Sequence, residues 1–298
     1  MPFDLESRLA AWKAGVEAYL DARLPPPETF PRPLYQSMRY SLFAGGKRIR
    51  PAFAFAAAEA VGGKPERVLP FAAALEMVHT YSLIHDDLPA MDDDELRRGK
   101  PTNHVLFGDG IAILAGDALL TDAFAVLASD EVAASTSPEL IVKVVGELAR
   151  GAGTGGMVAG QALDLTSEGK DVDLSTLEYL HTHKTGALIR AAVRIGALAG
   201  GADSASLEAL TAYAEELGLA FQIADDVLDV IGSTEALGKP VGSDEGLEKA
   251  TYPALLGIDE SKRRAAALMQ SAIARLQPFG ERAECLAALA RFVVERQH

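Results

Sequence analysis

Residues 111–127 read IAILAGDALLTDAFAVL, a run in which apolar side chains would cover nearly every side of a helix. Residues 53–61, FAFAAAEAV, show the same pattern. A helix that is apolar all round must be buried, whereas a surface helix carries only an apolar stripe. These segments therefore predict a large all-α protein, in which a central helix or an oligomer interface covers them.

The rest of the chain also follows the helical period, because Ala, Leu, Glu and Arg dominate and no alternating strand pattern persists. Helix breakers such as Gly62-Gly63, Ser137-Pro138 and Gly200-Gly201 separate the segments. We predict helices at 4–22, 34–44, 51–61, 66–88, 104–128, 138–167, 174–199, 204–231, 247–257, 260–277 and 281–296.

The sequence also predicts one helix cap and the domain organisation. Ser175, followed three residues later by Glu178, fits a capping box at a helix start. There is no internal repeat at solenoid spacing, which disfavours an α-solenoid. No linker or shift of composition divides the chain, so we expect a single domain over residues 1–298.

The charge balance limits the possible partners. With 28 basic and 42 acidic residues, the net charge is −14. Nucleic acids and anionic membranes require a basic face, so both are disfavoured. Phosphate compounds remain possible if the few cations converge on one site or if metal ions supply positive charge.

Three features predict a cytoplasmic protein. Cys285 is the only cysteine, which indicates a reducing compartment and a thiol that serves as a small apolar side chain in the core. Charged residues within 1–9 replace the apolar centre of a secretory signal. Asp109 and Asp117 interrupt the apolar run 105–120, which argues against a membrane span.

Two acidic clusters lie in apolar helical segments. YSLIHDDLPAMDDD at 81–94 places five aspartates in nine positions, and FQIADDVLD at 221–229 has the pattern DDxxD. Asp225 and Asp229 share a helix face, where two charges about 6 Å apart repel by roughly 3 kcal/mol at an effective dielectric of about 20. One DDxxD arises by chance, and Asp92–Asp94 also fit a solvated turn. The pair of clusters favours a Mg²⁺ or Mn²⁺ site.

Basic residues gather around these clusters. GGKRIRP at 45–51 combines backbone N–H groups at a helix start with Lys47 and Arg50, which predicts a diphosphate cradle, although a basic surface turn is the alternative. His79 lies two turns before Asp86 and is either structural or ligand-binding. The other basic residues near the clusters are Arg97, Arg98, Lys184, Lys239 and Lys249.

Gly151, Gly153 and Gly156 match the dinucleotide pattern GxGxxG. That fingerprint needs a preceding strand, whereas residues 139–150 are expected to be helical. We therefore reject dinucleotide binding and expect the glycines within 151–160 to allow either close helix packing or the approach of substrate.

The motifs in their order resemble those of the short-chain trans-isoprenyl diphosphate synthases, above all the bacterial farnesyl diphosphate synthases. The resemblance covers nearly the whole chain. The matching stretches are GGKRIRP, DDLPAMDDD, RRGKPTNH, GMVAGQALDL, KTGAL, FQIADDVLD, GKPVGSD and KATYP.

The resemblance implies an all-α helical bundle around a central cavity, generally as a homodimer. Mg²⁺, with three ions expected and Mn²⁺ possible, would be held by Asp86, Asp92, Asp225 and Asp229, and Asp87 would assist. Isopentenyl diphosphate would condense head to tail with dimethylallyl and then geranyl diphosphate. Gln161 and Asp164 match a family motif near the cavity, without a firm role.

The same resemblance divides the basic and polar residues between two substrates. The allylic diphosphate would contact Arg97, Lys184, Thr185, Gln222, Lys239 and Lys249. Isopentenyl diphosphate would contact Lys47, Arg50, His79 and Arg98. The Lys184 carbonyl, the Thr185 hydroxyl and Gln222 would stabilise the allylic carbocation.

Residues one to two turns before Asp86 would limit product length, since one isoprene unit is about as long as one helical turn, roughly 5 Å. Tyr81 and Ser82 occupy these positions, although Tyr81 also fits plain core packing. In the family, an aromatic residue there together with the insertion Pro89-Ala90 accompanies a C15 product. RRGKPTNH also occurs in geranylgeranyl diphosphate synthases, so a C20 product remains open.

Three other functions compete with this prediction. A terpene cyclase would need no second diphosphate site, and a head-to-head synthase would lack GGKRIRP and KATYP. A non-catalytic subunit of a heteromeric synthase would be expected to have degenerate aspartate motifs. Lys47, Arg50 and Arg98 argue against the cyclase, and the intact aspartates argue against the inactive subunit.

Overall fold

The computed structural model describes residues 4–231 and 250–295, and the expected all-α fold is confirmed. The helices of the first half are α1 (Leu5–Arg23), α2 (Arg32–Leu42), α3 (Ile49–Ala60), η1 (Pro65–Val68), α4 (Leu69–Asp86), α5 (Asn103–Phe107), α6 (Asp109–Leu127), α7 (Asp130–Ser135) and α8 (Pro138–Ala152). Those of the second half are α9 (Met157–Ser167), α10 (Leu174–His181), η2 (Thr182–Gly186), α11 (Ala187–Ala199), α12 (Ser204–Ile231), α15 (Tyr252–Leu256), α16 (Ile258–Arg275), η3 (Gln277–Ala283) and α17 (Glu284–Val294). A short hairpin pairs β1 (Leu96–Arg97) with β2 (Lys100–Pro101).

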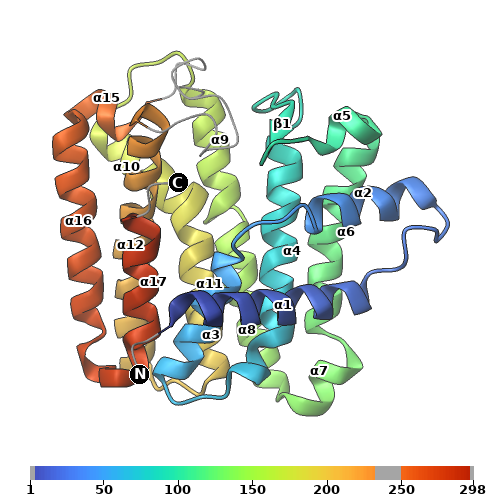
Figure 1. Cartoon of the computed structure of the whole chain (residues 1–298), viewed down its shortest axis with the longest axis horizontal. Coiled ribbons are helices and arrows are strands. Elements are labelled where there is room, and N and C mark those ends of the chain that lie inside the picture. Colours follow the sequence, from blue (N-terminus) through green and yellow to red (C-terminus); the bar gives the residue numbers. More distant parts are fainter. Residues whose placement is uncertain (1–3, 232–249, 296–298) are drawn as a thin grey trace.

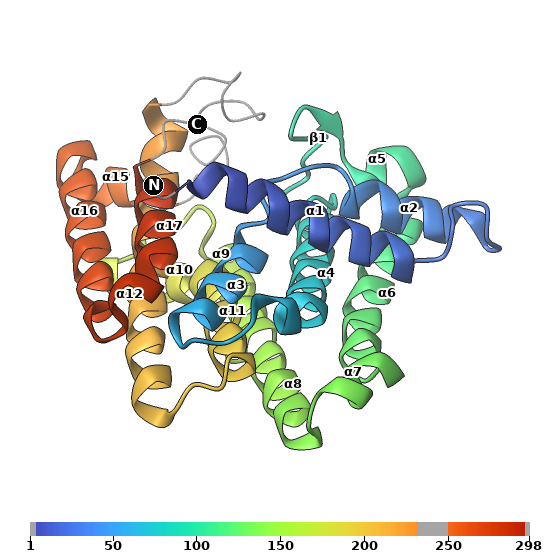
Figure 2. The ribbon, with the colours of Figure 1, turned by 60° about the horizontal axis from the view of Figure 1, so that its bottom comes forward.

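The long helices stand roughly parallel, and α1 and α2 cross them (Figures 1 and 2). The helix α3 is the central helix that the sequence predicted, because its side chains from Pro51 to Ala58 are buried. It packs against α11 at very short range: a Cβ on Gly196 would lie 2.0 Å from the Ala54 carbonyl oxygen. The small side chains of these two helices therefore bring the backbones together in the centre of the bundle.

Some helix boundaries differ from prediction. The segment 104–128 is divided at Gly108, whose φ is +80°, and 138–167 is divided at Gly153–Gly156. The helix α7 and the β1–β2 hairpin were not predicted. The expected cap at Ser175 is wrong, because Asp173 caps α10 by accepting a hydrogen bond from the Thr176 N–H at 2.8 Å.

The helix α6 is apolar but only partly covered. Ile113 and Leu114 remain 44% and 54% exposed, while α4 packs against the opposite face. Within the residues described, Asp109–Ser135 is the one stretch long and apolar enough to cross a membrane by length and composition, although its aspartates had argued against a span. Helices inside folded cores pass the same test.

Cys285 lies on α17 and is buried, as the sequence predicted. The strand that a dinucleotide site would require before Gly151 is replaced by α8, which confirms that the GxGxxG match is incidental.

Candidate active site

A cavity of about 880 Å³ is lined by residues from the C-terminal halves of α4 and α12 and from the segments around them. Asp86 is the last residue of α4, and Asp225 and Asp229 lie in the last two turns of α12. The C-terminal end of a helix is the negative pole of its dipole, so carboxylates there add to an existing negative potential. This part of the cavity is therefore built to attract cations.

Most of the predicted site residues line this one cavity. They are Lys47, Arg50, His79, Asp86, Asp92, Arg97, Arg98, Lys184, Thr185, Gln222, Asp225 and Asp229. Tyr81 and Ser82 are buried on α4 and are not part of its lining, and neither is Asp87. Lys239 and Lys249 lie outside the described residues.

Asp86 is poorly stabilised as a bare carboxylate. Burial raises its pKa to about 6, and the neighbouring charge of Asp92 adds to the rise, while Lys184 and Arg97 oppose it. A carboxyl group whose ionised form is disfavoured gains from a bound cation, because the cation compensates the charge. The environment of Asp86 thus fits a metal ligand.

The carboxylates fit a metal that is shared with a substrate. Throughout residues 4–231 and 250–295, no three His, Cys, Asp or Glu side chains cluster as a ready-made metal site. Asp86 and Asp92 come from one side of the cavity, whereas Asp225 and Asp229 come from α12. Mg²⁺ typically takes one or two carboxylates and completes its shell with water and phosphate oxygens. The donor set therefore suits Mg²⁺ bound together with a diphosphate.

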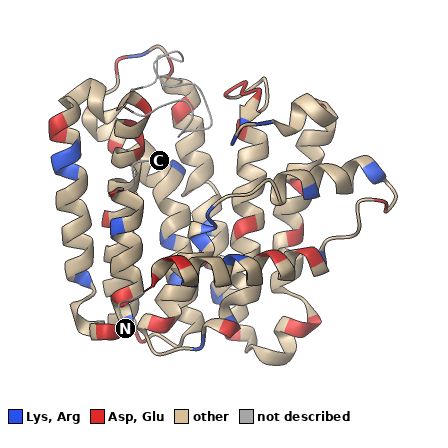
Figure 3. Cartoon of the chain, viewed as in Figure 1, with Lys and Arg blue, Asp and Glu red and all other residues tan. Residues whose placement is uncertain are grey.

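Arg97 reaches the cavity because Asp87 holds it. Its Nε and Nη2 donate to Asp87 Oδ1 at 2.7 and 2.6 Å, and Nη2 also lies 3.7 Å from Asp94. Burial raises the pKa of Asp87, although the hydrogen bond from Arg97 opposes that rise. Figure 3 shows basic and acidic segments side by side at this end of α4. In the structure, then, Asp87 orients a cation and does not face the cavity itself.

The second cationic group surrounds His79. Arg50 Nη1 lies 3.2 Å from His79 Nε2. Burial, followed by the charges of Arg50 and Arg98, lowers the pKa of His79 well below its usual value, so the ring is neutral and accepts this hydrogen bond. Burial also lowers the pKa of Arg50 to about 10, which leaves it charged at neutral pH. The pair presents positive charge to the cavity without metal.

The loop before α3 has an unusual backbone. Gly45 and Gly46 have φ values of +103° and +113°, and Arg48 has φ +52°. A non-glycine residue in this left-handed region costs about 1–2 kcal/mol. Arg98 packs closely on this loop, since a Cβ on Gly46 would lie 2.6 Å from Arg98 Nη1, and Arg98 donates to the Gly45 carbonyl.

The wide turn η2 carries Lys184 and Thr185 into the cavity. It is a single π-helical turn, a feature that often marks functional sites. This turn packs closely against α9, because a Cβ on Gly160 would lie 2.1 Å from the backbone nitrogen of Lys184. Lys184 pairs with Asp164, and Thr185 Oγ1 donates to Gln222 Oε1 at 2.8 Å.

Comparisons with known proteins show the family of the chain. The family model for polyprenyl synthetases matches residues 31–290. The chain belongs to the polyprenyl synthetase family. It is a prenyltransferase, a short-chain trans-prenyl diphosphate synthase, and members of this family need a divalent metal.

Its relatives carry two different product names. The chain is 49% identical to a geranylgeranyl diphosphate synthase from Cyanophora paradoxa, over 99% of this chain and 98% of that one. It is 50% identical to a farnesyl diphosphate synthase from Geobacillus stearothermophilus, over 90% of each. A crystal structure of a Helicobacter pylori geranyltransferase complexed with magnesium and isoprenyl diphosphate matches with a TM-score of 0.87 and 31% identity, covering 99% of both chains.

Asp226 is the site residue of this polyprenyl synthetase that sequence reasoning missed. Buried on α12, it accepts hydrogen bonds from Gln222 Nε2 at 3.1 Å and from the Tyr252 N–H at 2.9 Å, and its Oδ2 lies 2.9 Å from His181 Nε2. These bonds fix the Gln222 amide so that its Oε1 meets Thr185. The DDxxD pattern contained Asp226, but nothing in the pattern separated its role from that of Asp225.

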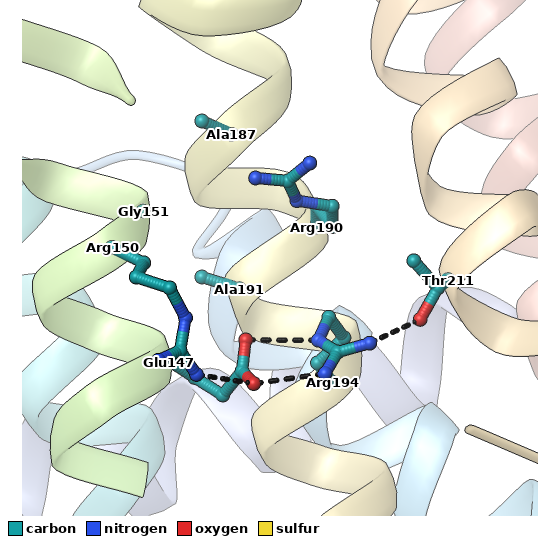
Figure 4. A pocket seen from close by; sticks show the side chains of 8 residues that line it. All are labelled: Glu147, Arg150, Gly151, Ala187, Arg190, Ala191, Arg194 and Thr211. Atoms are coloured by element: carbon teal, nitrogen blue, oxygen red, sulfur yellow. Dashed lines mark hydrogen bonds and ion pairs between the residues drawn. The ribbon is translucent and has the colours of Figure 1, made fainter. Parts of the chain in front are cut away.

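The polyprenyl synthetase also has a smaller cavity, of about 270 Å³, between α8, α11 and α12 (Figure 4). Arg194 forks to Glu147 there, with Nε–Oε2 and Nη2–Oε1 distances of 2.8 and 2.9 Å, and its Nη1 donates to Thr211. None of the predicted site residues lines this cavity, and it shares no lining residue with the large one.

Proposed function

We propose that the protein is a farnesyl diphosphate synthase, which condenses isopentenyl diphosphate head to tail with dimethylallyl and then geranyl diphosphate. The observation that supports this most strongly is the pairing of two anion sites in one cavity: the aspartates of α4 and α12 beside Lys184, and the metal-free group of Lys47, Arg50 and Arg98. A terpene cyclase would need only the first. Tyr81 one turn before Asp86 supports the C15 product.

The allylic diphosphate would lie between the aspartates and the basic residues Arg97 and Lys184, with Lys239 and Lys249 as further proposed contacts. Three Mg²⁺ ions, or Mn²⁺, would be held by Asp86, Asp92, Asp225 and Asp229, and would neutralise the charge that builds on the departing diphosphate. Interactions of this kind strengthen as the C–O bond breaks, so they lower the barrier rather than only binding substrate.

Thr185 and Gln222 would face the allylic carbocation together with the Lys184 carbonyl. Because Thr185 donates its proton to Gln222, the lone pairs of its oxygen remain available to positive charge. Isopentenyl diphosphate, held by Lys47, Arg50, His79 and Arg98, would present its alkene to this carbocation. The departing diphosphate would accept the final proton.

Product analysis tests the proposal directly. The purified protein is incubated with Mg²⁺, dimethylallyl diphosphate and isopentenyl diphosphate, and the dephosphorylated products are separated by chromatography. Farnesol is the expected alcohol. Geranylgeraniol as the main product would instead assign the C20 activity, which the Cyanophora paradoxa relative favours. Cyclised hydrocarbon would indicate a terpene cyclase, and no product would indicate a non-catalytic subunit.

The pKa of Asp86 predicts a pH dependence of metal binding. Because that pKa is raised to about 6, the carboxyl group is protonated below this pH and Mg²⁺ must displace the proton. We expect the half-saturating Mg²⁺ concentration to be constant above pH 7 and to rise by up to about tenfold per pH unit below pH 6. Mg²⁺ titrations of the reaction rate at four pH values would check this, and a flat profile would contradict it.

We also propose that the protein is a cytoplasmic homodimer in which the exposed side of α5 and α6 is the interface. Val105, Leu106, Ile113 and Leu114 are each 44–54% exposed there. Sedimentation equilibrium should give about twice the chain mass of 31.4 kDa, and Leu114→Glu should shift it towards one chain mass. An unchanged mass in the variant would place the interface elsewhere.

A further inference from the structure

Arg48 lies between Lys47 and Arg50 and, like them, lines the large cavity, but its guanidinium group is held by protein groups on several sides. Its side chain is only 2% exposed and points into the bundle. Nη1 donates to Glu76 Oε1 at 2.6 Å, Nη2 donates to the Leu42 carbonyl at 2.6 Å, and Nη2 and Nε donate to Glu17 Oε1 at 2.9 and 3.2 Å. One guanidinium group therefore joins α1, the end of α2, the start of α3 and α4.

This network fixes the part of the chain that carries the proposed isopentenyl diphosphate ligands. Arg48 is the residue before α3 and has the left-handed conformation φ +52°, ψ +45°. Its neighbour Lys47 and the first-turn residue Arg50 both line the cavity. An unfavourable backbone conformation persists only where surrounding contacts hold it. The four hydrogen bonds of Arg48 supply those contacts.

The network also connects this loop to α4. Glu76 lies three residues before His79, so both project from nearly the same helix face. Arg48 bonds Glu76, while Arg50 bonds His79. Two parallel links, both along the lining of the cavity, thus set the position of the loop against the helix. If the link from Arg48 to Glu76 were lost, only the link from Arg50 to His79 would remain between these two elements.

We propose that Arg48 is a positioning residue for the metal-free diphosphate site. It fixes the positions of Lys47 and Arg50 relative to His79. It also neutralises the charge of Glu76, so that no uncompensated carboxylate faces the bound anion. The inference rests on the proposed function, since it takes isopentenyl diphosphate as the ligand. This role requires the planar guanidinium group of Arg48. A lysine ammonium group matches its charge but cannot reproduce its fixed set of hydrogen-bond donors.

Two other roles would leave different signatures. If Arg48 acted only through its charge, Arg48→Lys would bind isopentenyl diphosphate as the native protein does. If it acted only in stability, binding would recover whenever stability recovers. Glu76 allows this second comparison: its Oε2 has no hydrogen-bond partner within the described residues, so loss of Arg48 strands a buried charge that Glu76→Gln removes.

The experiment compares Arg48→Lys, Arg48→Met and the double variant Arg48→Met/Glu76→Gln with the native protein. Arg194→Lys is the matched control, because Arg194 makes a similar fork to Glu147 and Thr211 outside the active cavity (Figure 4). For each, calorimetry without metal gives the Kd of isopentenyl diphosphate, steady-state kinetics give KM for both substrates, and urea unfolding gives stability.

We expect Arg48→Lys and the double variant to raise the Kd and KM for isopentenyl diphosphate about tenfold, with the KM for the allylic substrate changed less than twofold. The double variant should be more stable than Arg48→Met yet bind no better than Arg48→Lys. Arg194→Lys should lower stability and leave both KM values unchanged.

Native-like binding by Arg48→Lys would overturn the proposal, and so would recovery of binding in the double variant. An equal rise in both KM values would also overturn it. Should the native protein bind isopentenyl diphosphate but form no prenyl product, the proposed function would fail. The calorimetric comparison would still decide the role of Arg48.

Discussion

Replacing Asp86 with alanine is expected to lower kcat for prenyl transfer by about a thousandfold, comparable to losing a central electrostatic contact to the transition state. The reason is that the carboxylate would hold metal against the diphosphate as its charge increases. Steady-state kinetics at saturating Mg²⁺ would measure the loss. Asp109→Ala, an exposed carboxylate outside the cavity, is the control and should retain full activity. A loss of less than about tenfold would remove Asp86 from the metal site.

The same position should show the opposite effect on stability. In the metal-free protein the pKa of Asp86 is raised from 3.8 to about 6, so its ionisation opposes folding. The cost begins near pH 4, grows as the pH rises to about 6 and is complete above that value. Asp86→Asn should therefore increase the free energy of unfolding at pH 8 by about 3 kcal/mol. Urea unfolding of the metal-free native protein and of Asp86→Asn would test this. Equal free energies of unfolding for the two proteins at both pH 5 and pH 8 would contradict it.

Tyr81→Ala is expected to change the main product from C15 to C20. Tyr81 is buried on α4, and its ring packs edge-on against the His85 ring with 5.7 Å between the centroids. His85 in turn lies against α6, since a Cβ on Gly116 would be 2.1 Å from His85 Nε2. Removing the ring would open space between α4 and α6 for one more isoprene unit, roughly 5 Å long. Chromatography of the dephosphorylated alcohols would measure the shift.

The control for this change is Tyr81→Phe, which keeps the ring and should keep the C15 product. Because removing a buried aromatic ring costs about 3–5 kcal/mol, stability has to be measured alongside. A folded Tyr81→Ala protein that still makes only C15 would show that another residue limits the chain. The native cavity lining is consistent with a tail that stops short of Tyr81, since that side chain is not part of it.

Local signals predicted much of this molecule. The start of the helix at Ser204 was predicted correctly because Gly200-Gly201 precedes it and its apolar residues keep the helical period up to residue 231, where the described segment ends. The breaks at Gly108 and Gly153–Gly156 were missed because a glycine inside a helical pattern is often tolerated. The short helix α7 offers only one turn and a half of sequence, too little for a periodic signal.

The roles of neighbouring aspartates were harder to predict. Consecutive helix residues point about 100° apart, so the two members of a DD pair make different contacts. Asp86 lines the cavity whereas Asp87 holds Arg97, and Asp226 anchors Gln222 beside Asp225. One further partner is distant in sequence, since His181 lies 45 positions from Asp226, and no spacing rule reveals that pair.

The division of the carboxylates between α4 and α12 has a consequence for how the enzyme would respond in a cell. Among the described residues, no three His, Cys, Asp or Glu side chains come together, so a substrate would have to supply the remaining oxygen ligands of a bound Mg²⁺. The ion and the allylic diphosphate would then each increase the affinity of the protein for the other by the same factor, as thermodynamic reciprocity requires. Such a protein would hold little metal at a constant magnesium concentration until its own starter molecule arrived.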